Sequence, residues 1–447
     1  MLPIADLADQ LNQGQVTSLE LVERCLERIA DEKGEGSRTI LFSDQAKVRF
    51  TAKKIDQFRK SGKFVAPLAG IPISVKDLFD VAGEITTAGS ILLKKSTSAR
   101  VDAPSIKRLR DAGLILIGRT NMTEFAYSGL GLNAHYGTPR NPFDRKSGRI
   151  PGGSSSGAAI SVTDGMAAAA IGTDTGGSIR IPSALCGLVG FKPTARRIST
   201  DGVYPLCPSL DSIGPLATTV NCCALLDDIL SGASPKPINI PKVSTLHLAV
   251  PQTLVLNNLD SYVASTFEGA VKNISMAGAK ITDIPLNCLD EIPRVNSNGG
   301  IYAEAWTVHK DQFNGSRHLY DPRVAARIEK TQNILAEEYR GVLRARKALI
   351  SEANKITSNF DALILPTTPS SAPKIIDLER DGEAYTEMNT RMLRNSFCFN
   401  FLDRCALSIP MHAPGSAPCG LMIVGETLRD RELLGIGQAI EEVVNFS

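Results

Sequence analysis

Two glycine-rich segments carry the serines whose setting best suits nucleophilic chemistry. Residues 152–157 place three serines between glycines, and residues 172–180 place Ser178 directly after a Gly-Gly pair. A nucleophilic serine needs exposure, a base that removes its proton, and donors for the oxyanion that forms. Glycines leave room for successive backbone N–H groups to point into one concavity. The pattern therefore favours acyl transfer, with Ser178 as the nucleophile.

The base that would activate this serine is not an obvious histidine. The chain has five histidines, none of which lies in either serine segment: His135, His247, His309, His318 and His412. A lysine can serve when burial keeps its amine neutral, because desolvation disfavours the ammonium form and lowers the pKa. Lys76 follows the apolar run 71–75, which is typical of a buried strand, and is our candidate for the base.

The elements that must position these residues alternate between strands and helices. Thr17 and Glu20 form a capping-box pattern ahead of an apolar stripe, which predicts a helix that runs to about residue 29. Further helices are predicted at 44–61, 103–112, 259–278, 321–358 and 430–444. Strands are predicted at 71–75, 114–117, 246–250, 281–284, 361–366, 406–410 and 420–424. This β-α-β rhythm is typical of an α/β protein.

Two further stretches define the domain organisation. Residues 150–194 combine many glycines with apolar runs, which indicates folded core and not a flexible linker. The Pro- and Ser-containing stretch 232–244 predicts a linker or a surface excursion. We expect a single domain over residues 1–447, with a helical insertion at about 285–358 on the substrate side.

The two serine segments belong to a much longer pattern. Residues 152–157 and 172–180 continue into 181–187 and 190–194. Matching stretches lie upstream at 68–72, 75–77, 118–125, 136–137 and 141–142, and downstream at 209–216, 361–366, 420–422 and 432–434. The pattern resembles the amidase-signature family over essentially the whole chain, least between 225 and 360. The resemblance implies an α/β fold whose large mixed central sheet is covered by helices on both faces.

The resemblance also implies a triad of two serines and one lysine. Ser178 matches the nucleophile, Ser154 the bridging residue after a cis peptide bond, and Lys76 the base. Neutral Lys76 takes a proton from Ser154 as Ser154 takes one from Ser178. The remaining roles fall on the oxyanion donors Thr175, Gly176, Gly177 and Ser178, on Ser155 in the lysine network, and on Asp174 and Arg180 as braces of the loop. The family commonly has Gly at Ser156, a difference that a backbone with negative φ would accommodate.

Other interpretations of these residues are weaker. Residues 153–157 satisfy G-x-S-x-G, a nucleophile elbow that would make Ser155 the nucleophile and require a later Asp and His. That hypothesis leaves the segment around Ser178 unexplained. Neither glycine-rich loop has a phosphate-binding pattern. Cys186 lies among apolar residues, as a structural thiol would, and His135 is interpreted as a structural histidine or a substrate contact.

The function that follows is hydrolysis of a small-molecule carboxamide to a carboxylate and ammonia or an amine. One alternative is the glutaminase (A) subunit of a glutamyl- or aspartyl-tRNA amidotransferase, and another is a hydrolase of carboxybiuret- or allophanate-type ureido-acids. Residues 88–90 and 400–410 favour a free-standing enzyme. The acyl pocket is expected within 123–138 and 296–330, where the candidates are Tyr302, Trp306, His309, Tyr320 and Arg323. Arg323 or His309 would suit a carboxylated substrate.

The charge and cysteine content of the chain indicate which partners, location and cofactors to expect. Forty-nine basic and 47 acidic side chains give a net charge of +2 without a long basic block, so we expect neither a nucleic-acid nor a membrane partner. Nine cysteines follow no metal spacing, and the start of the chain lacks the layout of a secretory signal, which together favour the cytoplasm. We expect no cofactor and no metal, and either a homodimer or a small accessory subunit.

Overall fold

Short apolar runs form the strands of one central sheet. The structure is a computed structural model that describes residues 1–297 and 299–444. Its strands follow the order β1-β3-β2-β4-β6-β5-β10-β11-β9-β7-β8. The neighbours β3, β2 and β4 run parallel, as do β9, β7 and β8, whereas the strands between β4 and β9 pair antiparallel. The sheet is therefore mixed, as predicted.

The strands are β1 (Ile40–Phe42), β2 (Pro72–Lys76), β3 (Ile115–Thr120), β4 (Ala169–Asp174), β5 (Val189–Lys192), β6 (Ser212–Ala217), β7 (His247–Pro251), β8 (Lys280–Ile284), β9 (Ala362–Pro366), β10 (Ala406–Pro410) and β11 (Gly420–Val424). The α-helices are α1 (Ile4–Asn12), α2 (Ser18–Ala30), α3 (Gly36–Thr39), α4 (Gln45–Lys60), α5 (Pro104–Asp111), α6 (Ser156–Thr163), α7 (Arg180–Cys186), α8 (Val220–Ser231), α9 (Ser261–Met276), α10 (Cys288–Val295), α11 (Ala303–Ser316), α12 (Pro322–Glu329), α13 (Ala336–Thr357), α14 (Ile375–Arg380), α15 (Gly382–Phe401) and α16 (Asp430–Val444).

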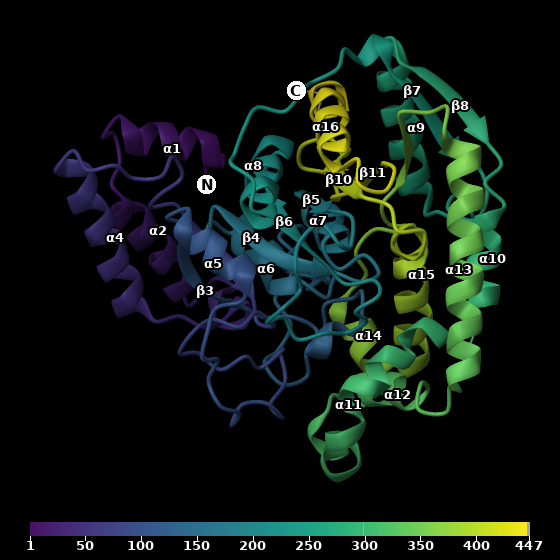
Figure 1. The fold of residues 1–447 in the computed structure, drawn as a ribbon, viewed down its shortest axis with the longest axis horizontal. Helices are drawn as coiled ribbons and strands as arrows, with labels where there is room; N and C mark the ends of the chain where they lie inside the picture. The colour runs from purple at the N-terminus through teal and green to yellow at the C-terminus, as the bar shows by residue number, and fades with distance from the viewer. Residues whose placement is uncertain (298, 445–447) are drawn as a thin grey trace.

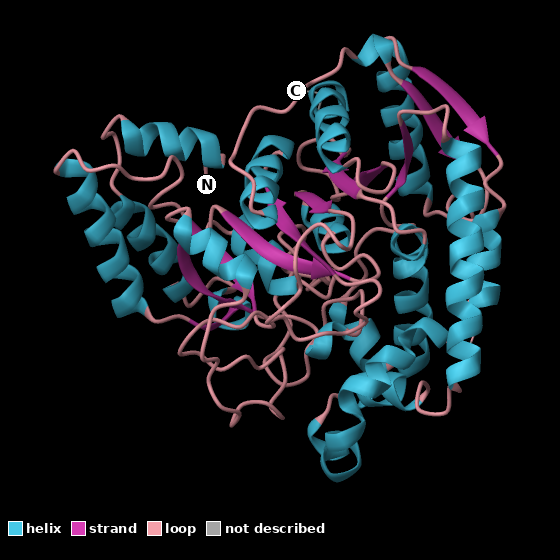
Figure 2. Ribbon diagram, viewed as in Figure 1, coloured by secondary structure: helices cyan, strands magenta, loops and turns pink. Residues whose placement is uncertain are grey.

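Helices cover both faces of the sheet (Figure 2). Ala170 of β4 packs in one apolar cluster with Ile160 of α6, while its neighbours Ala169 and Ile171 belong to the cluster that contains residues of α8. Successive side chains of a strand point to opposite faces, so this division places α6 and α8 on opposite sides. The sheet is consequently buried on both faces where it carries the serine segments.

Most predicted elements are present with slightly shifted ends. The capping box holds, because Thr17 Oγ1 accepts from the Glu20 N–H at 3.1 Å and the Glu20 carboxylate accepts from the Thr17 N–H at 2.7 Å. The stretch 321–358, predicted to be helical, is helical over most of its length. This stretch divides into α12 and α13, and α13 begins where the Glu338 carboxylate accepts from the Leu335 N–H at 2.7 Å. That contact satisfies a backbone donor at the start of a new helix.

The segment 285–358 lies between β8 and β9 and holds α10 to α13, with no strand among its described residues. These helices and α15 form the side of the molecule drawn in green and yellow in Figure 1. The stretch 232–244 is a surface excursion, since none of its residues is buried. The carbonyls of Lys236 and Pro237 accept from Arg431 of α16. In the described part of the chain, no helix has the length and apolar character that crossing a membrane requires. The single-domain organisation stays a prediction.

Candidate active site

Strand β2 delivers Lys76 into the interior of the molecule. Every residue of β2 is buried, and the Lys76 side chain is fully enclosed. Its amine donates to Ser154 Oγ at 2.8 Å and to Thr173 Oγ1 at 2.9 Å. Burial lowers the pKa of Lys76 from 10.5 to about 7, although the carboxylates of Asp174 and Asp211 act in the opposite direction. A lysine in this setting is largely neutral at slightly alkaline pH.

The first serine segment lies directly on this amine. The peptide bond between Gly153 and Ser154 is cis, as predicted. Ser155 is fully buried, and its hydroxyl donates to the carbonyl of Thr173 at 3.3 Å, so it joins the residues around Lys76. An elbow nucleophile would need an exposed hydroxyl, which Ser155 does not have. Ser156 begins α6 and is absent from the residues with positive φ, so its Cβ fits the loop.

The second serine segment connects β4 with α7 and lies beside the first. The Ser155 N–H donates to the carbonyl of Ser178 at 3.3 Å. Ser178 retains 3% exposure, and within residues 1–297 and 299–444 its hydroxyl has no hydrogen-bond partner. Gly177 has a φ of +133°, and a Cβ there would lie 2.1 Å from Ser396 Oγ. The turn that presents Ser178 thus requires glycine at the preceding position.

A buried ion pair holds both ends of this turn. The Asp174 carboxylate accepts from Arg180 Nε at 3.0 Å and from Arg180 Nη2 at 2.9 Å. It also accepts from the Gly177 N–H at 2.8 Å and from the Ile179 N–H at 3.1 Å. Burial opposes the ionisation of Asp174, but the Arg180 guanidinium holds its pKa well below the ordinary value. The pair therefore sets the shape of the loop.

The contacts of Asp174 leave some of the expected oxyanion donors free and occupy one of them. The Gly177 N–H, which was expected among them, already donates to Asp174 and is not free in this structure. The N–H groups of Thr175, Gly176 and Ser178 have no such partner among the described residues. Thr175 is held from its side chain, since its hydroxyl donates to Asp211. The set of three donors is consistent with a hole for one oxygen atom.

One face of α15 bonds to the nucleophile loop and to Gly129. Ser396 Oγ donates to the carbonyl of Gly176 at 2.6 Å, and Asn400 Nδ2 donates to Asp174 at 2.9 Å. Asn389 lies two helical turns before Ser396, and its Oδ1 accepts from the Gly129 N–H at 2.9 Å. Between them, Leu393 lies 3.5 Å from the place that a Cβ on Gly176 would occupy. Sequence reasoning missed this helix, although polar residues at helical spacing in an apolar setting mark a face bonded to other elements.

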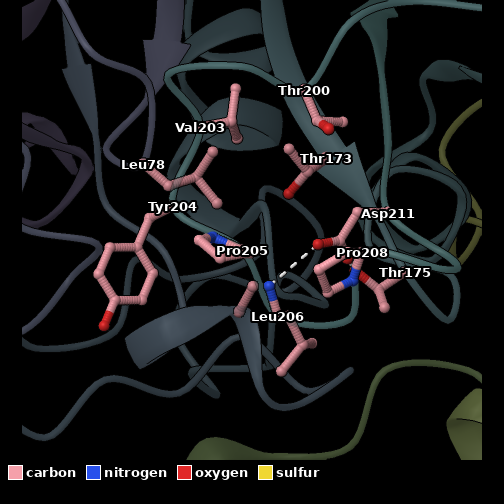
Figure 3. Close-up of a pocket in the computed structure, with 11 residues that line it drawn as sticks. Leu78, Thr173, Thr175, Thr200, Val203, Tyr204, Pro205, Leu206, Pro208 and Asp211 are labelled. Carbon is pink, nitrogen blue, oxygen red and sulfur yellow. Dashed lines mark hydrogen bonds between the residues drawn. The ribbon is translucent and has the colours of Figure 1, made fainter. Parts of the chain in front are cut away.

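Two cavities flank the nucleophile loop. A small one of about 40 Å³ is lined by Thr173, Thr175 and Asp211, whose carboxylate accepts from the Leu206 N–H at 3.0 Å (Figure 3). A larger one of about 930 Å³ is lined by residues of the 285–358 segment and of α15. The hydroxyl of Tyr302, which lines this cavity, lies 3.3 Å from the Cβ position of Gly176. The large cavity therefore reaches the expected oxyanion loop.

The five candidates for the acyl pocket divide into two groups. Tyr302 and Arg323 line the large cavity. The other three pack with neighbouring aromatic rings outside the lining: His309 and Tyr320 against Phe125 and each other, and Trp306 against Phe313. Arg323 is neutralised by Asp321 at 2.8 Å. Arg327, one helical turn later, lines the cavity as well and was missed.

The remaining candidates have structural surroundings. His135 Nε2 lies 2.8 Å from the buried carboxylate of Glu124. Cys186 is buried, and its thiol lies 3.2 Å from the carbonyl of Pro151. Burial raises the pKa of Cys186 far above the ordinary range, which makes a thiolate nucleophile unfavourable. Among the residues that the structure describes, no group of three or more His, Cys, Asp or Glu side chains is placed to hold a metal ion.

Known proteins share both the sequence and the fold of this chain. The family model Amidase matches residues 20–434. A 2-amino-5-chloromuconic acid deaminase of Comamonas testosteroni is 34% identical, over 99% of this chain and 96% of the relative. The A subunit of a glutamyl-tRNA(Gln) amidotransferase from Symbiobacterium thermophilum is 32% identical, over 99% and 97%. A crystal structure of an amidase superposes with a TM-score of 0.89 at 30% identity, over 99% of this chain and 100% of the other. The chain therefore belongs to the amidase family and is an enzyme that hydrolyses carbon–nitrogen bonds of non-peptide amides.

Proposed function

We propose that this enzyme hydrolyses small carboxamides through an acyl-enzyme on Ser178, with Ser154 as proton relay and Lys76 as base. The observation that carries the proposal is the fully buried Lys76 amine, with its pKa lowered to about 7, at 2.8 Å from Ser154 Oγ. An amine that is neutral near pH 7 can accept a proton, whereas an ordinary lysine is charged there.

The proposed mechanism uses these three side chains in turn. Neutral Lys76 accepts the proton of Ser154, and Ser154 accepts the proton of Ser178 as Ser178 Oγ bonds to the amide carbon. The carbonyl oxygen becomes an oxyanion that the N–H groups of Thr175, Gly176 and Ser178 would receive. The proton then returns through Ser154 to the leaving nitrogen as the carbon–nitrogen bond breaks. Water attacks the acyl-enzyme by the same relay and releases the carboxylate.

The substrate class that we propose is a small amide or ureido-acid that carries a carboxylate. Arg327 lies over the ring of Tyr127, with 4.7 Å from its guanidinium carbon to the ring centre. Its Nε is buried and has no hydrogen-bond partner in the described residues, unlike the neutralised Arg323. A guanidinium with free donors is well suited to a carboxylate. The name of the Comamonas relative includes a carboxylic acid, which supports this choice.

The second candidate function is that of the glutaminase chain in a tRNA-dependent amidotransferase. The 32% identity to the Symbiobacterium relative favours it, and glutamine also carries a carboxylate. The same relative is one subunit of a larger enzyme. We propose that this chain also assembles, either as a homodimer or with a small accessory subunit. We also propose a cytoplasmic location, because all nine cysteines are free and buried.

The test is ammonia release from a panel of small primary amides, aryl amides, ureido-acids and glutamine. We expect turnover of at least one carboxylated amide, and a loss of about 10⁴-fold or more in Ser178→Ala. Mass spectrometry after rapid acid quenching should detect an acyl adduct on wild type and none on the variant. Turnover that survives Ser178→Ala would overturn the triad. Glutaminase activity that appears only with tRNA and partner chains would favour the second candidate.

A further inference from the structure

The side-chain amide of Asn389 on α15 has a buried N–H group without an acceptor among the described residues. Asn389 is fully buried, and its Oδ1 accepts from the Gly129 N–H and from the Ser128 hydroxyl, both at 2.9 Å. A backbone N–H can only donate, so this contact fixes which end of the amide is oxygen. The Nδ2 group must then lie on the other side, where it is buried without a partner in the described residues.

The free amide lies at the wall of the large cavity, close to the proposed bridging serine. Asn389 lines the cavity of about 930 Å³, as do Tyr302 and Arg327. The carbonyl of Gly129, whose N–H binds Asn389, accepts from the Gly153 N–H at 2.8 Å. Gly153 directly precedes Ser154. Two hydrogen bonds thus connect Asn389 to the peptide that positions the relay hydroxyl.

The charge of the cavity wall points to the kind of group that this donor would meet. Four cationic side chains line the cavity, Arg323, Arg327, Lys330 and Arg394, and one carboxylate, that of Glu338. The Glu338 carboxylate already accepts the Leu335 N–H at the start of α13. The charged side chains of the wall are therefore mostly cationic, which favours a ligand group with acceptor oxygens. Buried donors in native proteins are nearly always paired, and leaving one unpaired is unfavourable.

We propose that Asn389 Nδ2 donates to an acceptor oxygen in the acyl chain of the substrate, and so selects amides that carry a second carbonyl or carboxylate. This inference rests on the proposed function and adds a second determinant to it. Arg327 responds to negative charge, whereas an amide N–H responds to any acceptor oxygen, charged or neutral. The two residues should therefore discriminate between substrates in different ways.

Three amides of matched chain length separate these two effects. Butyramide has no second acceptor, succinamide has a neutral one, and succinamate has a charged one. Asn389→Asp keeps the acceptor for Ser128 and Gly129 and removes the donor. We expect it to lower kcat/KM for succinamide and succinamate relative to butyramide by about tenfold or more, mainly through KM. Arg327→Met should lower the relative value for succinamate alone.

A matched control is Asn273→Asp on α9, which makes the same change outside the cavity lining and should leave all three ratios unchanged. If Asn389→Asp does not fold, as judged by thermal denaturation, Asn389→Ala removes the donor together with the acceptor for Ser128 and Gly129, and the test is then its kcat/KM for succinamide relative to butyramide. An equal loss toward all three amides would show that Asn389 only supports the fold, and would overturn the inference while the proposed function stands. Absence of any Ser178-dependent turnover of the three amides, and of the wider panel, would instead count against the proposed function.

Discussion

At the scale of the residue, the charge of Lys76 decides when the proposed site is active. Burial lowers its pKa to about 7, and the base is the neutral form. The fraction of neutral amine grows as pH rises through this value, so we expect kcat/KM to increase about tenfold per pH unit below 7 and to level off above about 8. A pH–rate profile on a non-ionising amide such as butyramide measures this. A profile that is flat or falls between pH 5 and 7 would contradict the role of Lys76.

Ser155 and Ser178 separate the triad from the elbow hypothesis. Ser155 Oγ donates to a backbone carbonyl at 3.3 Å in a fully buried position, which is a supporting contact. Ser155→Ala should therefore reduce kcat by no more than about the tenfold that one lost hydrogen bond represents, whereas Ser178→Ala should remove activity. Steady-state kinetics of the two variants, each checked by circular dichroism, makes the comparison. If Ser155→Ala were inactive and Ser178→Ala active, the elbow would be correct.

At the scale of the element, α15 and the nucleophile loop fit together through Gly177. A Cβ at this position would lie 2.1 Å from Ser396 Oγ, and the backbone φ of +133° disfavours any side chain. Gly177→Ala should distort the loop and lower kcat by about 10²–10³, the typical loss when an oxyanion donor is misplaced. The measurement is kcat on a small amide, with the unfolding midpoint recorded alongside.

Gly269→Ala is the matched control for this change. Gly269 lies inside α9, where a Cβ would contact nothing within 4 Å. The same substitution there should leave kcat unchanged and raise the free energy of unfolding by about 0.5–1 kcal/mol, because alanine favours the helix. Similar kinetics for the Gly177→Ala variant and wild type would show that the loop tolerates a side chain, and would contradict the expected role of Gly177.

The residue pattern of each element decides whether it could be predicted from the sequence. The strands β2, β9, β10 and β11 are short apolar runs, and prediction located all four. Strands β5 and β6 escaped because Gly190, Gly214 and Pro215 interrupt their pattern, although both are fully buried in the sheet. Helix α15 escaped because its buried face includes asparagine and serine. Those side chains bond to loops distant in sequence, and such contacts are invisible to local periodicity.

At the scale of the whole molecule, the sheet brings together residues that the sequence separates widely. Lys76 ends β2 and Ser178 follows β4, and these two strands are parallel neighbours. Parallel neighbours end at the same edge of a sheet, which explains why a lysine and a serine 102 positions apart share one site. Residue types alone supplied both candidates but not their proximity, which came only from the family resemblance. Arg327 and Asn389 belong to neither signature segment, so only the folded chain identifies them.

The burial of all nine cysteines predicts that the thiols of the native enzyme react slowly. All nine cysteines are free and buried, and burial raises the pKa of Cys25, Cys398 and Cys419 to about 12 each. An excess of a thiol reagent such as 5,5′-dithiobis(2-nitrobenzoate) should therefore label almost no thiol in the native enzyme within minutes, and nine after denaturation in guanidinium. Activity should persist through native treatment, since the proposed chemistry uses hydroxyls and an amine. Rapid labelling of one thiol with matching loss of activity would place a cysteine in the site and contradict the serine–lysine mechanism.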